Sequence, residues 1–164
     1  MACFHLRYSS GTGLLSIALS PLVGHYTATD IGALIPLIQK NITHNFPAGQ
    51  TSKVSVAELD WIAIQSASPA QRTKLYDVSE SPVDLILAVD CIYHPTLIPP
   101  FLATLDYLCT TGKTTAMVVS ELRAADVMLE FLETWLNLPG WQVWRVPNNL
   151  LGKRYVIFVG WKEC

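Results

Sequence analysis

The residues best suited to chemistry in this chain lie at positions 83–95, where an apolar run ends in a carboxylate. Leu85–Val89 contains no polar side chain, Asp90 follows directly, and Tyr93 comes three positions later. Such a run predicts a strand buried on both faces, as in a parallel sheet. Ligands bind beyond the carboxyl ends of the strands in open α/β sheets, so Asp90 and Tyr93 are candidate functional residues. Alternatively, Asp90 caps a turn and Tyr93 is a half-buried aromatic.

A second candidate lies nearer the N-terminus, where Gly11, Thr12 and Gly13 separate an expected strand from an expected helix. Glycine lets the backbone approach a ligand, and a helix N-terminus offers unpaired N–H groups. Ser16 stands where a dinucleotide fingerprint has its third glycine, which disfavours nicotinamide binding. Asp30 follows at about the spacing at which a carboxylate binds ribose hydroxyls, or else it N-caps the next helix.

Asp60 and Trp61 end the third expected strand. An indole there can stack on a planar base, or it can cover the core as a rim residue. Because the carboxyl ends of neighbouring parallel strands meet at one edge of a sheet, Gly13, Asp30, Trp61 and Asp90 are expected to lie together.

The apolar spacing predicts the elements that position these residues. Strands are expected over residues 4–8, 26–29, 53–59, 84–89, 114–120, 142–146 and 155–161, and helices over 14–19, 33–45, 99–111 and 124–136. Residues 62–81 are polar and are expected to form a loop with at most one short helix. Strands that alternate with helices imply an α/β fold with parallel βαβ units, and the last two strands suit an antiparallel hairpin at one edge.

Composition predicts one domain over residues 1–164. Hydrophobic residues make up 51% and charged residues 15%, and the formal net charge is −2. No basic stripe of the kind that binds nucleic acid is present, and no apolar run reaches the length of about 20 residues that a membrane span needs. The four cysteines are far apart, which favours reduced thiols and no metal site. The expected location is the cytoplasm, with the nucleus as a second compartment.

With these residues placed, the chain resembles the class I (seven-β-strand) methyltransferases that use S-adenosylmethionine. Within them it is similar to the protein-lysine methyltransferases marked by an Asp-x-x-Tyr motif after strand four, here Asp90 to Tyr93. It looks most like the fungal ribosomal-protein lysine methyltransferases, through residues 10–18, 84–95, 118–123 and 151–162. The resemblance implies a Rossmann-like sheet, mostly parallel with an antiparallel C-terminal hairpin, and flanked by helices.

The resemblance also implies roles for individual residues. The implied S-adenosylmethionine-binding positions are Gly11, Thr12, Gly13, Asp30, Asp60, Trp61 and Val89. Among them, Asp30 would hold the ribose hydroxyls and Trp61 would line the adenine. Asp90 and Tyr93 would face the transferred methyl group and the incoming lysine amine, and no metal is implied.

The implied substrate is a lysine of a basic protein, ribosomal or translation-related, with no direct contact to nucleic acid or membrane and with the enzyme as a monomer. A lysine amine has an unperturbed pKa near 10.4, so it must lose its proton before it can attack a methyl group. The carboxylates Glu58, Asp60, Asp77, Glu80 and Asp84 would form an acidic approach for such a substrate, or they are ordinary solvated side chains.

The chain departs from the family pattern at strand one. The family's acidic, apolar and glycine residues are replaced by Arg7, Tyr8 and Ser9, and residues 4–8 alternate as in an edge or half-exposed strand. Only a few residues precede this strand, so the chain is expected to be shortened at its N-terminus. Two rival functions therefore stay open: an inactive or cofactor-poor relative that acts as a binding protein, and a small-molecule N-methyltransferase.

Overall fold

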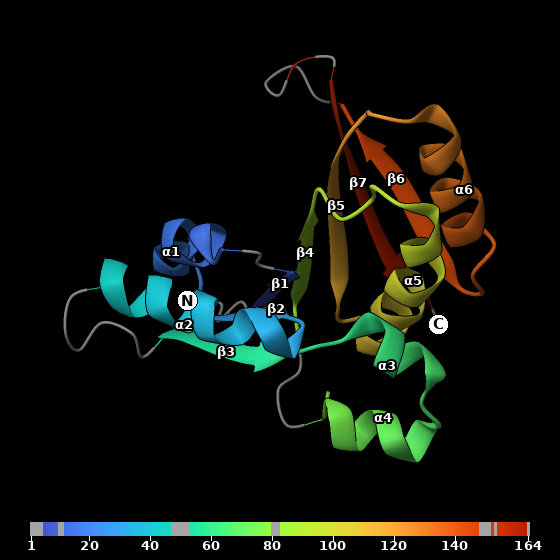
Figure 1. Cartoon of the computed structure of the whole chain (residues 1–164). Coiled ribbons are helices and arrows are strands. Elements are labelled where there is room, and N and C mark those ends of the chain that lie inside the picture. Colours follow the sequence, from blue (N-terminus) through green and yellow to red (C-terminus); the bar gives the residue numbers. More distant parts are fainter. Residues whose placement is uncertain are drawn as a thin grey trace.

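The computed structural model describes residues 5–9, 12–46, 53–79, 83–147, 152 and 154–163, the first range by its backbone alone. Among these residues seven strands form a single sheet in the order β3-β2-β1-β4-β5-β7-β6 (Figure 1). The strands are β1 (His5–Ser9), β2 (His25–Asp30), β3 (Val54–Glu58), β4 (Leu85–Val89), β5 (Thr115–Glu121), β6 (Trp141–Val146) and β7 (Tyr155–Lys162). Within the described ranges, no helix has the length and apolar character that crossing a bilayer requires.

The strand pairing confirms a mostly parallel α/β sheet with an antiparallel C-terminal pair. β1 to β5 pair in parallel, whereas β7 runs antiparallel to both β5 and β6. β7 therefore lies between β5 and β6, and β6 forms the edge of the sheet.

β1 is an interior strand, because its backbone pairs with β2 on one side and with β4 on the other. The expectation of an edge strand over residues 4–8 is thus wrong, since backbone pairing, not side-chain alternation, fixes a strand's place in the sheet. The side chains of this strand lie outside the described part, so the alternative of a half-exposed strand stays a prediction.

Six α-helices connect the described strands. They are α1 (Leu14–Leu19), α2 (Ile35–Asn45), α3 (Trp61–Ser66), α4 (Pro69–Leu75), α5 (Ile98–Leu108) and α6 (Ala125–Leu136). The loop expected over residues 62–81 is wrong, because two short helices occupy most of it. Local capping explains them: the Asp60 side chain caps α3, and Ser68 forms a capping box with Gln71 at the start of α4.

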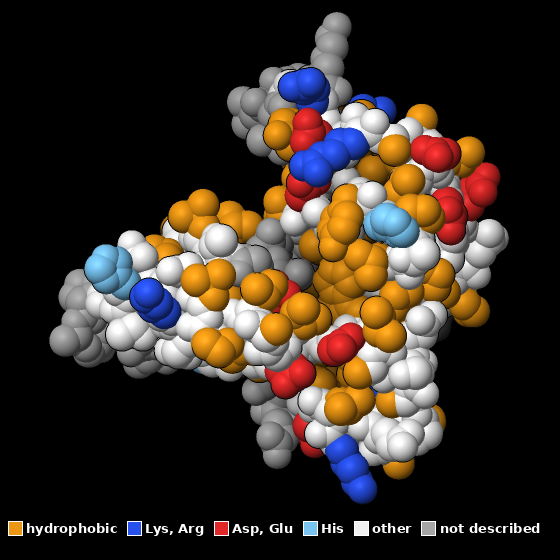
Figure 2. Space-filling model, viewed as in Figure 1, with side chains coloured by type: hydrophobic (Ala, Val, Ile, Leu, Met, Phe, Trp, Pro, Cys, Tyr) orange, Lys and Arg blue, Asp and Glu red, His pale blue; other side chains and the backbone are white. Residues whose placement is uncertain are grey.

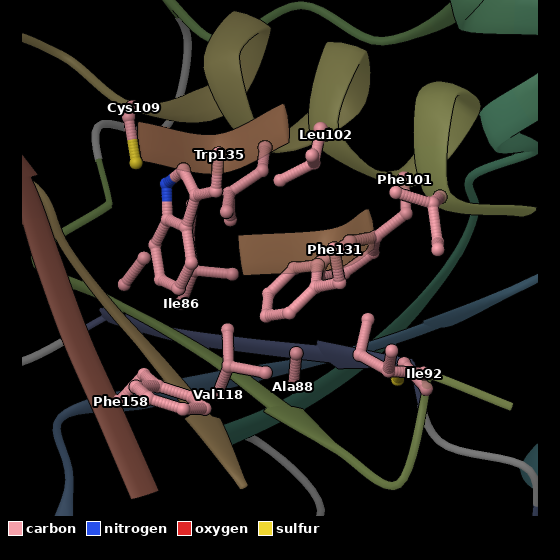
Figure 3. Close-up of a cluster of buried hydrophobic side chains, with 14 of the residues drawn as sticks. Ile86, Ala88, Ile92, Phe101, Leu102, Cys109, Val118, Phe131, Trp135 and Phe158 are labelled. Carbon is pink, nitrogen blue, oxygen red and sulfur yellow. The ribbon is translucent and has the colours of Figure 1, made fainter. Parts of the chain in front are cut away.

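The larger core lies between one face of the sheet and helices α3, α5 and α6. Phe131 is its centre, with ring centroids 5.3 Å from Trp135, 6.1 Å from Phe101 and 6.4 Å from Phe158 (Figure 3). These rings pack on Val118 of β5 within one continuous cluster of buried residues. Aromatic burial on this scale anchors α5 and α6 on the strands whose ends carry the candidate site.

The opposite face carries a smaller core of Tyr26, Ala28, Ile38, Ile42 and Leu87, against which α1 and α2 pack. β4 contributes Leu87 to this core, while its neighbours 86 and 88 belong to the larger one. The prediction that β4 is buried on both faces is therefore confirmed. Leu129 of α6 is 57% exposed, because α6 turns that side to solvent.

Candidate functional site

A cavity of about 640 Å³ opens where β2 and β4 end and α3 begins. Its lining residues are Thr12, Asp30, Ile31, Leu34, Leu59, Asp60, Trp61, Ile62, Val89, Asp90, Cys91, Tyr93 and Leu97. The space-filling view shows hydrophobic side chains gathered around the recess between the arm that contains α2 and the body that contains α5 (Figure 2). Seven of the nine expected site residues line this one cavity, so the expected convergence at one edge of the sheet is found.

The two remaining residues are Gly11 and Gly13. Gly11 lies outside the described residues. Gly13 does not line the cavity, but its left-handed backbone (φ 81°) turns the chain into α1 next to Thr12, which does. Another residue type at that φ would cost about 1–2 kcal/mol.

Ser16, at the place of the fingerprint's third glycine, is fully buried, and its hydroxyl donates to the Gly13 carbonyl oxygen at 2.6 Å. The Thr12 carbonyl oxygen accepts a hydrogen bond of 2.8 Å from the side-chain amide of Asn41 on α2. The segment that enters α1 is thus held from both sides, and Ser16 has a structural role here.

Asp30 is the last residue of β2, and its carboxylate lies at the cavity wall. One of its oxygens accepts from the backbone N–H of Ile31 at 2.9 Å. The next helical element is a short 3-10 helix over Gly32–Leu34, and its N-cap residue is Ile31. The alternative in which Asp30 is the N-cap of the next helix is therefore wrong. The ribose role of Asp30 is not tested by this geometry and stays a prediction.

Asp60 and Trp61 stand at the start of α3, and each has a structural contact as well as a place in the cavity wall. Asp60 Oδ1 accepts from the backbone N–H groups of Ile62 at 2.8 Å and Ala63 at 3.2 Å. The Trp61 ring meets Phe101 edge-on, with centroids 5.1 Å apart and an angle of 65°. Covering the core and lining the cavity are therefore compatible for this indole.

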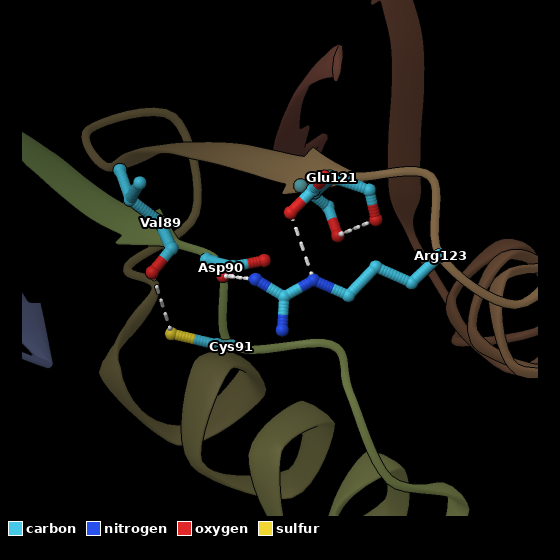
Figure 4. Close-up of polar contacts among 6 residues, drawn as sticks. Val89, Asp90, Cys91, Glu121 and Arg123 are labelled. Atoms are coloured by element: carbon cyan, nitrogen blue, oxygen red, sulfur yellow. Dashed lines mark hydrogen bonds and ion pairs between the residues drawn. The ribbon is translucent and has the colours of Figure 1, made fainter. Parts of the chain in front are cut away.

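Asp90 leaves β4 with a left-handed backbone (φ 56°), the one positive φ outside glycine in the described residues. Its N–H donates to the Val119 carbonyl oxygen at 2.7 Å, which ties it to β5. Asp90 Oδ2 forms an ion pair with Arg123 (Figure 4), while Oδ1 is buried without a partner in the described part. Oδ2 is consequently the oxygen that a ligand can reach.

Tyr93, three residues later, lines the cavity with 58% of its surface exposed. The alternative in which Tyr93 is a half-buried aromatic residue is therefore wrong. An exposed ring at the cavity mouth is placed to meet an incoming side chain.

Arg123 is a residue of this site to which the sequence assigned no role. It follows β5, and its Nε donates to Glu121 Oε2 at 2.9 Å while its Nη2 contacts Asp90. The hydrogen bond to Glu121, followed by the charge of Asp90, raises the pKa of Arg123 further above its ordinary value, so the guanidinium stays charged. Because 33 positions separate Arg123 from Asp90, no local pattern marks the pair.

The acidic approach is only partly found. Asp84 precedes β4 and so lies at the opposite end of that strand from Asp90, which removes it from the approach. Glu58 does lie opposite Asp30 in the β2–β3 register. Glu80 is outside the described residues, and in the ranges that are described no three metal-binding side chains cluster.

The sheet order, with five parallel strands and an antiparallel β7 inserted beside β5, together with a cavity at the strand ends, defines a class I methyltransferase fold. The solved structure of the glycopeptide N-methyltransferase MtfA with S-adenosyl-L-methionine covers 99% of this chain and 88% of its own, with a TM-score of 0.68. At 9% identity this likeness is one of fold alone.

The chain belongs to the lysine methyltransferase family, whose model matches residues 5–137. It is 33% identical to the protein-lysine methyltransferase METTL21E of Bos taurus, over 63% of this chain and 33% of that protein. It is 31% identical to ribosomal lysine N-methyltransferase 5 of Zygosaccharomyces rouxii (78% and 49%) and 27% identical to EEF1A lysine methyltransferase 3 of Xenopus tropicalis (78% and 51%). The chain thus spans about a third to a half of the length of these relatives.

Proposed function

We propose that this chain binds S-adenosylmethionine in the strand-end cavity and transfers its methyl group to the side-chain amine of a lysine in a protein. The observation that carries the proposal is the convergence of Asp30, Trp61, Asp90 and Tyr93 on one cavity, although they come from three separate segments of the chain. Membership of the lysine methyltransferase family supports the same reaction class.

The described residues fit an adenosyl group. A cavity of about 640 Å³ lies within the range of small-molecule sites, and its wall combines apolar side chains with a few carboxylates. Asp30 can accept hydrogen bonds from ribose hydroxyls, and Trp61 and Ile62 offer apolar surface to a planar base. The bound cofactor supplies a sulfonium methyl: the amine lone pair forms the N–C bond, the C–S electrons stay on sulfur, and a proton leaves the nitrogen.

The chain's own task is to position a neutral amine. Asp90 Oδ2 can accept a hydrogen bond from the amine and set its direction, and the exposed Tyr93 ring favours a cationic nitrogen on its face. Holding the amine next to the methyl group in a recess that excludes water supplies much of the rate increase in such displacements.

We further propose that the substrate is a basic protein that is ribosomal or translation-related. The chain would act on it as a monomer, in the cytoplasm and, as a second location, in the nucleus. The carboxylates of Asp30 and Glu58 at the ends of β2 and β3, and of Asp60 at the start of α3, favour a positively charged partner. The names of the ribosomal and EEF1A relatives support this class of substrate.

Titration calorimetry with S-adenosylmethionine tests the cofactor step. We expect the chain to bind it, and Asp30→Ala to weaken binding roughly 10-fold or more, since hydrogen bonds to a charged group contribute about 1.5–3 kcal/mol. Asp84→Ala is the matched control, because this carboxylate lies at the far end of β4, and it should bind as the unmodified chain does. Absence of binding by the folded, unmodified chain refutes the proposal.

Incubation with radiolabelled cofactor and a cell extract tests the acceptor. Label is expected in a protein band, at a lysine identified by mass spectrometry. Label confined to the small-molecule fraction supports the small-molecule N-methyltransferase instead, and cofactor binding without any transfer supports a binding protein.

A further inference from the structure

Asp90 has one polar side-chain partner in the described part of the chain, and that partner is Arg123. Asp90 Oδ1 is buried and makes no hydrogen bond to described residues, whereas Oδ2 meets Arg123 Nη2. The carboxylate is therefore fixed from a single side. Without Arg123, no side chain of the described residues would fix the rotation of this carboxylate about its Cβ–Cγ bond.

Arg123 is itself held in place. Its Nε donates to Glu121 Oε2, its backbone N–H donates to the Glu121 carbonyl oxygen at 2.9 Å, and the next residue back, Leu122, donates to the Arg154 carbonyl oxygen at 2.7 Å. The planar guanidinium thus bridges the ends of β4 and β5, with one carboxylate on each side (Figure 4). Arginine suits such a bridge because its N–H groups are fixed in one plane.

We propose that Arg123 is a positioning residue for the methyl-transfer reaction: it fixes the Asp90 carboxylate with Oδ2 toward the substrate amine and, by its own positive charge, favours the neutral amine over the ammonium ion. The inference rests on the proposed function, since it names a further residue of the same site. A carboxylate oxygen has room for two donors, so Arg123 and the amine can share Oδ2.

Several charged and titratable groups lie around Asp90 and the cavity. Arg123 pairs with Asp90 and Glu121, Tyr155 of β7 acts electrostatically on Arg123, and Tyr93, Asp30 and Asp60 line the cavity together with Asp90. Arg123 is the cation paired directly with the receiving carboxylate. An amine that shares Asp90 Oδ2 with Arg123 lies next to a like charge, which disfavours the ammonium ion and so lowers the pKa of the bound lysine.

Steady-state kinetics over a range of pH separates the two parts of the role. Arg123→Gln removes both the bridge and the charge, so kcat should fall about 10-fold to 100-fold, as expected for a misplaced reacting group. The pH profile of kcat, which reports groups in the enzyme–substrate complex, should shift to higher pH by about one unit. Arg123→Lys keeps the charge but loses the planar bridge, so its pH profile should match the unmodified chain while kcat stays reduced.

Arg145→Gln, which changes an exposed arginine of β6, is the matched control and should alter neither quantity. Thermal unfolding should change little in the Arg123 variants, because exposed ion pairs add little stability. An Arg123→Gln variant with unchanged kcat and pH profile overturns the proposal, as does an Arg123→Lys profile shifted as far as that of Arg123→Gln.

Nitrogen-15 NMR of the Arg123 side chain provides a test that needs no cofactor and no activity. Rotation of the guanidinium should be slow in the unmodified chain and faster in Asp90→Asn and in Glu121→Gln, since each variant weakens one side of the bridge. A freely rotating guanidinium in the unmodified chain refutes the positioning role. If the calorimetry shows no cofactor binding while the rotation is slow, the proposed function fails and the bridge stands as a structural finding.

Discussion

Asp90 donates its backbone N–H to the carbonyl oxygen of Val119 at 2.7 Å, one residue beyond the end of β4, and does so in the left-handed region. The hydrogen bond extends the β4–β5 ladder by one step, and the positive φ then turns the side chain out of the strand direction. The motif carboxylate is thereby placed at the cavity by backbone geometry as well as by its ion pair with Arg123.

This geometry separates the backbone and side-chain roles of Asp90. Asp90→Ala and Asp90→Gly both remove the carboxylate, so both should abolish methyl transfer while changing cofactor affinity little. Glycine adopts positive φ without strain, so the Gly variant should be more stable than the Ala variant by about 1 kcal/mol. Denaturant unfolding and transfer of labelled methyl measure the two effects, and a fully active Asp90→Ala chain contradicts the role given to this residue.

The two roles of Asp60, as the cap of α3 and as a residue of the cavity wall, can be separated in the same way. Asp60→Ala should lower the free energy of unfolding by about 1 kcal/mol, because it loses the hydrogen bonds to Ile62 and Ala63, whereas Asp60→Asn keeps a capping oxygen. Asp60→Asn should then be as stable as the unmodified chain yet bind S-adenosylmethionine more weakly. Equal affinity in a calorimetric titration would limit Asp60 to its structural role.

Gly160 of β7 packs directly against the Trp135 indole. A Cβ atom at this position would lie 2.6 Å from Trp135 Cζ2 and 3.1 Å from the Gln142 carbonyl oxygen. Since neither the fully buried ring nor the backbone can move cheaply, Gly160→Ala should cost about 1–3 kcal/mol of stability in denaturant unfolding.

Gly32 provides the control for that substitution. Its added Cβ would also come too close to another atom, at 2.8 Å, but that atom is the end of the exposed and flexible Glu58 side chain. Gly32→Ala should therefore cost much less than Gly160→Ala. Equal losses in the two variants would show that the rigidity of the contacted atom does not decide the cost.

Cys109 should make stability depend on alkaline pH. Burial raises the pKa of its thiol from 9.0 to about 12, with nearby Lys162 opposing the shift. The folded state thus holds this proton more tightly than the unfolded state, so the contribution is complete below pH 9 and is lost as the pH rises from about 9 toward 12. One such group changes the unfolding free energy by at most about 1.4 kcal/mol per pH unit.

Cys109→Ala should accordingly flatten the decline in unfolding free energy measured between about pH 9 and 10.5. Leu108→Val, which alters the neighbouring buried position without a titrating group, should leave that slope unchanged. The same slope in Cys109→Ala as in the unmodified chain would show that the thiol does not titrate with folding.

Much of the fold could be predicted because it is encoded in short stretches. The continuous apolar run of β4 predicted a strand buried on both faces, and the apolar spacing after residue 99 predicted α5. The helices α3 and α4 were missed, although Asp60, Ser68 and Pro69 are local start signals. The polar composition of residues 62–81 favours a loop, but the local capping residues decide whether short helices form.

In the candidate site, too, some features follow from short stretches of sequence and others do not. The sequence by itself indicated that Asp30 and Asp90 stand at strand ends and reach one edge, because a parallel sheet places all its carboxyl ends together. Trp61 was expected to end the third strand; it instead starts α3, three residues after β3 ends, and still lines the cavity. Only the tertiary structure decided that β1 is interior, that Asp84 lies at the wrong end, and that Arg123 holds Asp90. These three features depend on contacts between segments that are distant in the sequence, and the spacing of neighbouring residues does not predict such contacts.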